Sequence, residues 1–274
     1  MTGPQVAATE NGIIGEGMDG QEFFSNVSST YYQETFGDLK TLSSFGRARR
    51  TARVLRTLDR LIKPASVVAD IGCGPAQLAA PVTAMGHEYV GVDPNPEMYS
   101  LTAEKLRGNP QARFFTGSAE EIPLSDASVD AVTCIGVVEY LPDRVRALRE
   151  VFRILRPQGI AILTFPNLRN PVQLLREAIH PVVAPMLRAL IPRLRRTVYV
   201  SGIPHAVMFP GKFRREAASV GLAKVDGFAD GYYPLSFNHP LFPMEKTLAD
   251  WSDKVGGTIL PGLGNNYYLC VEKR

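Results

Sequence analysis

The chain has 274 residues, of which 45% are hydrophobic and 21% charged, enough for one sizeable domain or one domain with an elaborated cap. Its 30 basic and 27 acidic residues leave a net charge of only +3, a balance that does not indicate a nucleic-acid-binding protein. Cys73, Cys134 and Cys270 lie in or beside apolar runs without CxxC spacing, which predicts reduced, buried thiols in a cytoplasmic protein and neither disulfides nor metal ligands.

The N-terminal part is predicted to consist of an arm and cap helices. Residues 1–20 are rich in glycine and contain no Lys, no Arg and no long apolar core, so we expect no signal or transit peptide. The stretches FFSNVSSTYYQETF and GRARRTARVLRTLDRLI carry apolar residues at helical spacing. No apolar segment is long enough to predict a membrane-spanning helix.

From Pro64 onward, short apolar runs alternate with helical segments. The predicted strands cover 66–71, 88–92, 112–116, 129–134 and 158–165, and the helices between them lie near 76–85, 96–107 and 143–155. The runs VVADI, YVGVD and AILTF lack polar alternation, as expected for strands that are buried on both faces. This alternation predicts an α/β fold with a doubly wound, parallel sheet and helices on both faces.

The pattern changes after Phe165. Residues 167–205 are too long for an ordinary connection, and prolines at 181 and 192 divide and close two predicted helices. We expect this insert to be a lid packed on the domain, and the alternative is an interfacial membrane anchor. Its apolar face consists of Val172, Leu175, Ile179, Val182, Met186 and Leu190. A helix at 210–220 and strands at 222–229 and 265–273 complete the prediction.

The stretch VVADIGCGPAQLAA ends a predicted strand with Asp70 and continues into a turn with Gly72 and Gly74. Glycine lets the backbone turn sharply and approach a ligand closely. The next strand ends in Asp93, roughly 20 residues further on, a spacing typical of a carboxylate that binds a ribose diol. Ligands of doubly wound sheets bind at the carboxyl ends of the strands, so these residues are expected to form one site. The alternatives are an ordinary strand–helix turn and, for Asp93, a helix N-cap.

The chemistry of this turn distinguishes two nucleotide ligands. A dinucleotide fingerprint requires G-x-G-x-x-G, whereas no third glycine follows Gly72 and Gly74 at that spacing. Asp70 would repel a phosphate but attract an ammonium group, directly or through water. The combination favours a ligand with an amino-acid head, a ribose and an adenine, namely S-adenosylmethionine, over a nicotinamide dinucleotide.

With the ordered set DIGCG, Asp93 and GSAEEIPLSDASVDAV, the chain resembles the class I S-adenosylmethionine-dependent methyltransferases, strongly over residues 45–165. The stretch LREVFRILRPQGIAILTFPN is similar to the small-molecule methyltransferases of the ubiquinone-biosynthesis type. The resemblance implies a Rossmann-like seven-stranded sheet of order 3-2-1-4-5-7-6, with strand 7 antiparallel and a helical cap. The implied units are the arm and cap helices (1–63), the S-adenosylmethionine-binding core (64–166), the lid or substrate insert (167–205) and the completion of the sheet (206–274).

The resemblance also assigns cofactor-site roles. Asp70, Gly72 and Gly74 fall at the methionine part and Asp93 falls at the ribose. The remaining positions are Met98 packing on the adenine, Ser118 and Ala119 at the adenine edge, Ile135 with a carbonyl facing the methionine amine, and Arg47 facing the methionine carboxylate. The chain departs from the family pattern at Ala76, where a third glycine is usual, at Ser118, where Asp is usual, and at Tyr140, where His is common.

A general base is needed if the acceptor carries a proton that must leave during methyl transfer. His205 is the first candidate because His titrates near neutral pH, and Glu139 and His239 are the others. A structural imidazole at position 205 and a capping or diol-binding carboxylate at position 139 remain open alternatives. No metal site is predicted.

The predicted function is methyl transfer to an apolar small molecule, at oxygen, nitrogen or carbon, in specialised metabolism. Aromatic residues of the C-terminal third are candidates for an apolar pocket: Phe209, Phe213, Phe228, Tyr232, Tyr233, Phe237 and Phe242. The alternatives are a membrane-associated lipid or quinone methyltransferase and a non-catalytic S-adenosylmethionine-binding protein. No nucleic-acid partner is expected, contact with a membrane surface is the less favoured reading of the insert, and the oligomeric state is not predicted.

Overall fold

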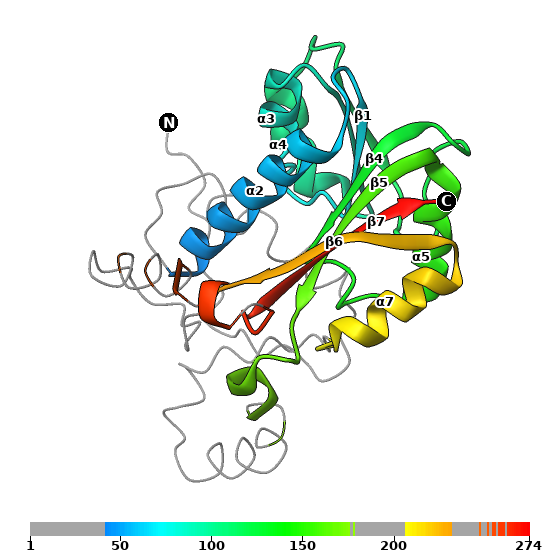
Figure 1. The fold of residues 1–274 in the computed structure, drawn as a ribbon. Coiled ribbons are helices and arrows are strands. Elements are labelled where there is room, and N and C mark those ends of the chain that lie inside the picture. The colour runs from blue at the N-terminus through cyan, green and yellow to red at the C-terminus, as the bar shows by residue number, and fades with distance from the viewer. Residues whose placement is uncertain are drawn as a thin grey trace, which may run out of the picture.

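The computed structural model describes residues 42–175, 206–231 and 262–274, together with isolated positions at 178 and between 247 and 260. The N-terminal arm, most of the 167–205 insert and the aromatic residues Tyr232, Tyr233, Phe237 and Phe242 lie outside the described residues. The division of the chain into four units therefore remains a prediction. Figure 1 shows the described elements in colour around one central sheet.

A seven-stranded sheet of order β3-β2-β1-β4-β5-β7-β6 forms the centre of the molecule, which confirms the predicted fold class and strand order. Strand β7 runs antiparallel to both of its neighbours, β5 and β6, whereas the other pairs are parallel. The strands are β1 (Val67–Ile71), β2 (Glu88–Asp93), β3 (Ala112–Thr116), β4 (Val129–Ile135), β5 (Leu155–Pro166), β6 (Leu222–Asp230) and β7 (Asn266–Lys273). Parallel strands β1 to β5 all present their carboxyl ends at the same edge.

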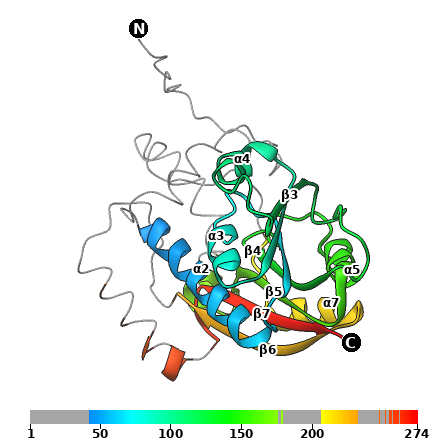
Figure 2. The same cartoon turned by 90° about the horizontal axis from the view of Figure 1, so that it is seen from above.

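Helices cover both faces of this sheet, as Figure 2 shows. Two apolar cores are buried between the helices and the sheet. The helices α2 (Leu42–Leu61), α3 (Ala79–Ala84) and α4 (Pro96–Lys105) lie on one side, and α5 (Arg144–Ile154) and α7 (Pro210–Ser219) lie on the other. In α5 the buried residues Ala147, Leu148, Val151 and Ile154 recur at three- and four-residue spacing, so one face of the helix packs on the sheet. The sheet is therefore the middle of three layers, as the sequence pattern predicted.

Two predicted boundaries differ from the structure, and a non-glycine residue with a left-handed backbone lies near each of them. The helix expected from residue 76 begins only at Ala79, since Gly74 and Ala76 have φ of 51° and 54°. Left-handed φ cannot continue into a right-handed helix. Strand β5 begins at Leu155 and not at 158, and it contains Gln158 with φ of 66°. The sequence signalled neither position, because Ala and Gln favour right-handed helix.

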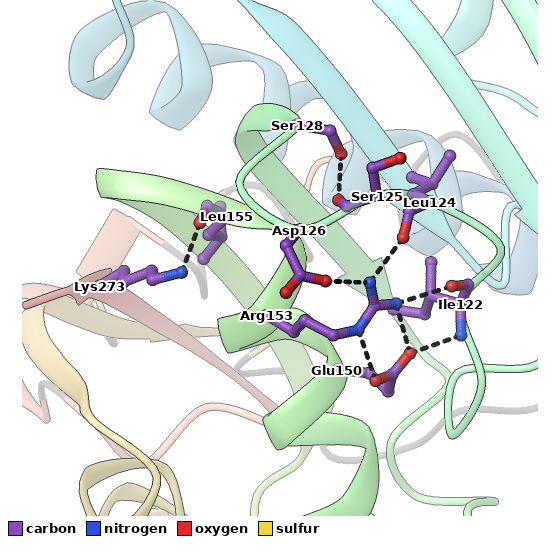
Figure 3. Close-up of polar contacts among 9 residues, drawn as sticks. All are labelled: Ile122, Leu124, Ser125, Asp126, Ser128, Glu150, Arg153, Leu155 and Lys273. Atoms are coloured by element: carbon purple, nitrogen blue, oxygen red, sulfur yellow. Dashed lines mark hydrogen bonds and ion pairs between the residues drawn. The ribbon is translucent and has the colours of Figure 1, made fainter.

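The connection between β3 and β4 has turns and no helix in residues 117–128, and Arg153 of α5 holds it in place (Figure 3). The guanidinium donates to the carbonyls of Ile122 and Leu124 at 2.8 and 2.6 Å and to both oxygens of Glu150. A further bond of 2.9 Å reaches Asp126, and hydrogen bonding to Arg153 lowers the pKa of Glu150. A cavity of about 320 Å³ between this connection and β1–β3 contains none of the predicted site residues.

Helix α2 is tied to the β6–β7 edge by two carboxylates of β6. Asp230 is 4% exposed, pairs with Arg53 Nε at 3.0 Å and accepts a 2.8 Å hydrogen bond from the Tyr268 hydroxyl. Two turns further along α2, Arg60 pairs with Asp226 near the surface. These two links fix α2 across the sheet, so that its earlier residues reach the carboxyl ends of the central strands.

Candidate functional site

The glycine turn and the end of β2 meet in the fold, as the sequence predicted. The amides of Gly72 and Cys73 donate to the carbonyl of Val92 at 2.8 and 3.1 Å, and the amide of Gly74 donates to Asp93 Oδ2 at 2.8 Å. Gly72 and Gly74 have φ of 67° and 51°, conformations that favour glycine. The turn after β1 is therefore held directly against the carboxylate of Asp93 at the end of β2.

Gly72 also permits a close approach of the loop that follows β4. A Cβ at this position would fall inside the contact distance of Val137 Cγ2 and lie 3.0 Å from Val137 Cγ1. At Gly74 a Cβ would lie 3.5 Å from the methyl of Met98, which is ordinary contact. The first glycine is thus required by packing as well as by backbone conformation, and the second mainly by conformation.

Asp93 is buried, at 7% exposure, and both of its oxygens accept backbone hydrogen bonds. Oδ2 accepts from Gly74 and Oδ1 accepts from Asn95 at 3.0 Å. Burial raises the pKa of Asp93, and these amide bonds oppose the shift. The N-cap of α4 is Asn95, whose side chain accepts from the Glu97 amide, so the alternative of Asp93 as the N-cap is wrong. An ionised carboxylate has about four acceptor positions, which leaves Asp93 two for a ligand.

The residues predicted around an adenine lie next to these two elements. Met98 is 4% exposed in the first turn of α4 and faces Gly74. The Gly117 amide donates to the Asp93 carbonyl at 3.2 Å, which places the start of the β3–β4 connection beside the end of β2. Ser118 forms a single bridge with Glu121, and Ala119 is buried. One edge of the sheet therefore brings together the predicted methionine, ribose and adenine positions.

The end of β4 and helix α2 lie together on the other side of the glycine turn. Ile135 is the last residue of β4, and the amide of the next residue, Gly136, donates to Thr164 Oγ1 at 2.9 Å. The guanidinium of Arg50 lies beside Gly136, with Nη1 at 3.0 Å from the position of an added Cβ. Arg47, the predicted residue, is half-buried one turn earlier on α2. Sequence reasoning missed Arg50, which the three-residue spacing from Arg47 could have indicated.

Asp70 lies beneath the turn, at 3% exposure, and both of its carboxylate oxygens have hydroxyl partners. Tyr89 donates to Oδ2 at 3.0 Å and Thr133 donates to Oδ1 at 2.7 Å. Burial raises the pKa of Asp70 to about 6, although the bonds from Thr133 and Tyr89 act in the opposite direction. The side chain thus carries a titratable charge beneath the glycine turn, fixed by neighbours on β2 and β4.

Of the two catalytic candidates, Glu139 lies in the loop after β4 and His205 lies outside the described residues, as does His239. Glu139 is 6% exposed, and its carbonyl accepts from the Ala206 amide at 2.7 Å. Burial raises the pKa of its carboxyl to about 7, and its own backbone amide and the charge of Arg50 oppose this shift. A carboxyl that titrates near neutral pH can exchange a proton with a bound molecule under physiological conditions.

Replacing Tyr89 with Phe should destabilise the fold in a pH-dependent manner. The variant loses a hydrogen bond to a carboxylate, worth about 1.5–3 kcal/mol, and the pKa of Asp70 should rise further above about 6. The pKa of Asp70 is higher in the folded than in the unfolded protein. At low pH Asp70 is protonated in both the wild type and the variant, so the loss of unfolding free energy should be small. It should grow as the pH rises through about 6 and the wild-type carboxyl ionises. Denaturant unfolding across this pH range measures the difference.

Tyr99→Phe is the matched control for this prediction. Tyr99 also packs against Phe114, but its hydroxyl bonds to Thr116 at 3.0 Å near the surface. Tyr99→Phe should lower the free energy of unfolding by much less than Tyr89→Phe does. Its loss should also show no change with pH near the pKa of Asp70. Equal, pH-independent losses for the two variants would contradict the assigned Tyr89–Asp70 coupling.

Comparison with known proteins agrees with this geometry. Residues 69–163 match the family model described as a methyltransferase domain. An uncharacterized methyltransferase of Mycobacterium sp. (strain KMS) is 39% identical over 99 residues, which are 36% of this chain and 38% of that protein. One from Mycobacterium tuberculosis (strain ATCC 25618 / H37Rv) is 42% identical over 92 residues, 34% of this chain and 36% of the relative. The match thus spans less than two fifths of the length of these relatives.

Solved structures share the fold over most of the chain. The magnesium protoporphyrin IX methyltransferase of Synechocystis PCC 6803, solved with bound S-adenosylhomocysteine, has a TM-score of 0.63 at 14% identity and covers 93% of this chain and 98% of that one. A putative methyltransferase of Haloferax volcanii, solved in complex with the Trm112 activator, has a TM-score of 0.59 at 19% identity, with 93% and 98% covered. At these identities the likeness establishes the fold.

The seven-stranded sheet has the fold of solved methyltransferases, and the methyltransferase-domain model matches the segment that contains the glycine turn and Asp93. The relatives that match this segment are named methyltransferases, and the Synechocystis structure holds S-adenosylhomocysteine, so S-adenosylmethionine is the cofactor that the comparisons support. Among the described residues, no group of three or more His, Cys, Asp or Glu side chains is arranged to hold a metal ion. None of the helices within the described ranges has the length and apolar character that a membrane crossing requires.

Proposed function

We propose that this protein transfers the methyl group of S-adenosylmethionine to an apolar small molecule, at oxygen, nitrogen or carbon, in specialised metabolism. The observation that carries the proposal is the meeting of the glycine turn, Asp93 and the end of β4 at one edge of the sheet, within a matched methyltransferase domain. The residues fit the cofactor because the glycine turn lies within hydrogen-bond distance of Asp93 and because Asp93 keeps two acceptor positions.

Each cofactor residue has a proposed part in binding. Asp93 accepts the two ribose hydroxyls, while Gly72 and Gly74 let the backbone approach the methionine portion, which Asp70 attracts from beneath through its charge. The remaining contacts are Met98 against the adenine, Ser118 and Ala119 at its edge, the Ile135 carbonyl toward the amine and Arg47 toward the carboxylate. Bound S-adenosylmethionine supplies a methyl group already activated on a sulfonium. The protein mainly has to hold the acceptor in line with it, which can be worth about 7–11 kcal/mol.

The apolar character of the acceptor is supported by the two ends of the 167–205 insert. Asn167 pairs with Met208, so the segments that enter and leave the insert lie side by side. Val172, Leu174, Leu175 and Phe209 around this junction are 44–59% exposed. We propose that they face the acceptor or the closing lid. Phe213 and Phe228 have other roles, since Phe213 is fully buried and Phe228 stacks on Tyr268.

The same exposed apolar residues favour one alternative, a methyltransferase that acts on a lipid or quinone at a membrane surface. Flotation with anionic liposomes separates the two functions. Protein that stays at the bottom of the gradient supports a free small-molecule acceptor, and protein that floats with the vesicles supports the membrane alternative. A non-catalytic S-adenosylmethionine-binding protein is excluded by transfer of the methyl group to any acceptor.

Asp93→Ala should weaken S-adenosylhomocysteine binding at least about tenfold, because each charge-assisted hydrogen bond contributes about 1.5–3 kcal/mol. Titration calorimetry measures the affinity, and circular dichroism verifies that the variant is folded. Glu88→Ala is the matched control: it lies at the opposite end of β2 in an exposed pair with Arg113 and should leave the affinity unchanged. Unchanged affinity in the folded Asp93 variant would refute the proposed cofactor site.

A further inference from the structure

Glu139 lies in a loop that packs directly on the glycine turn. Val137, two residues before it, occupies the space against Gly72, and Gly136 is covered by the Arg50 guanidinium. Ala206 fixes the backbone of Glu139 through its carbonyl. Glu139 therefore belongs to a loop that packs beside the proposed methionine position, at the carboxyl ends of β4 and β5.

The Glu139 carboxyl differs from the other buried carboxylates of this edge in its partners. Both oxygens of Asp70 and both oxygens of Asp93 accept hydrogen bonds. Glu139 Oε2 is buried and has no hydrogen-bond partner among the residues that the structure describes. A buried carboxylate oxygen without a donor costs free energy unless a bound molecule supplies the donor.

The charged and titratable surroundings of Glu139 fit a proton acceptor. Arg50 of α2 is the cation that stabilises its ionised form. The Cys134 thiol of β4 is close enough to feel the charge of Glu139. Burial and this charge raise the pKa of the thiol well above its usual value. Cys134 therefore stays protonated throughout the range in which Glu139 titrates.

We propose that the acceptor is a protic nucleophile, an apolar molecule that presents a hydroxyl or an amine, and that Glu139 Oε2 accepts its hydrogen. The inference rests on the proposed methyl transfer and adds the class of acceptor atom. A lone pair of the oxygen or nitrogen forms a bond to the methyl carbon, and the carbon–sulfur bond breaks with its electron pair going to sulfur. The proton passes from the acceptor atom to Glu139, so that the products are the methylated acceptor, S-adenosylhomocysteine and a neutral Glu139.

The position of the transferred methyl tests the proposal. The wild-type protein is incubated with S-adenosylmethionine labelled with ¹³C in the methyl group and with a panel of apolar phenols, alcohols and amines, together with indoles and 1,3-diketones as carbon nucleophiles. The ¹³C shift of each product distinguishes a methyl on oxygen or nitrogen from one on carbon. Label on oxygen or nitrogen is the expected result. Label on carbon alone overturns the inference but keeps the proposed function, and no labelled product at all overturns both.

The Glu139→Gln variant tests the residue. It should lower kcat for the labelled acceptor about 10²- to 10⁴-fold without changing the affinity for S-adenosylhomocysteine. The rise of wild-type kcat with pH through about 7 should also disappear. Glu216→Gln is the matched control, because Glu216 Oε2 is also buried but faces Arg144 on α5, and this variant should keep full turnover. Full turnover in Glu139→Gln, together with its loss in His205→Ala, would overturn the assignment.

Discussion

Gly72→Ala is expected to reduce both stability and cofactor affinity. A left-handed backbone costs an L residue about 1–2 kcal/mol, and the new methyl group would overlap Val137, adding about 1–3 kcal/mol for overpacking. Val137 cannot yield easily, because β-branched side chains are stiff at χ1. The variant must therefore push the β4 loop away from the turn. Chemical denaturation measures the stability, and calorimetry with S-adenosylhomocysteine measures the affinity.

Two further variants separate the causes of this loss. Gly86→Ala shares a left-handed φ, at 83°, but nothing lies within 4 Å of the added Cβ, so it reports the backbone cost alone and should leave the affinity unchanged. Gly72→Ala combined with Val137→Ala relieves the overlap and should recover part of the lost affinity. If Gly72→Ala behaves like Gly86→Ala in both assays, the contact between the turn and the β4 loop has no role in binding.

The sheet could be predicted in outline because its buried strands are short apolar runs and its helices have regular spacing. Strand β1, with the sequence VVADI, is buried along almost its whole length, which is the property that the sequence pattern detected. The order of the strands came from the resemblance, since neither periodicity nor composition determines which strands pair. Element ends were missed where the local conformation contradicts propensity, as at Ala76 and Gln158.

The candidate site was predictable at positions where the type of residue limits what it can do, as with a glycine in a tight turn or an aspartate at a strand end. The glycine turn and Asp93 were expected to meet because both lie at the carboxyl ends of strands, and the structure brings them within hydrogen-bond distance. The partners of Asp70 were not predictable, because Tyr89 and Thr133 come from β2 and β4 and meet this carboxylate only when the sheet has formed. The three-residue spacing from Arg47 places Arg50 on the same face of α2, but its position beside Gly136 depends on how α2 packs on the sheet.

The structure specifies how Asp70, the carboxylate beneath the glycine turn, can act on a ligand. Asp70 was expected to attract an ammonium group directly or through water. Its two oxygens already accept from hydroxyl groups and it is almost fully buried, which favours action through its charge or through water over a direct bond. The hydroxyl of Tyr89 keeps part of that charge available at neutral pH by opposing the effect of burial on the pKa of Asp70.

Asp230→Ala is expected to destabilise the protein by about 3 kcal/mol, the lower end of the range for breaking a buried ion pair. The carboxylate is 4% exposed and receives the Arg53 guanidinium and the Tyr268 hydroxyl. Its removal leaves that hydroxyl buried without its acceptor and weakens the attachment of α2 to the sheet. The 29% exposure of the Arg53 side chain lets water compensate part of the loss, which is why the lower end applies. Denaturant unfolding measures the effect.

Asp226→Ala provides the control within the same pair of elements. Asp226 also lies on β6 and pairs with α2, but its partner Arg60 is 58% exposed and the carboxylate is 33% exposed. Exposed ion pairs contribute about 0–1 kcal/mol, so this variant should lose less than a third of what Asp230→Ala loses.

The contribution of the Asp226–Arg60 pair should depend on pH. Because Arg60 lowers the pKa of Asp226, the contribution of the pair to stability should be present at neutral pH and disappear as acid protonates the folded carboxylate. Equal losses for both variants would show that burial does not set the strength of these links. A larger loss for Asp230→Ala would support the buried carboxylate as the stronger of the two links between α2 and β6.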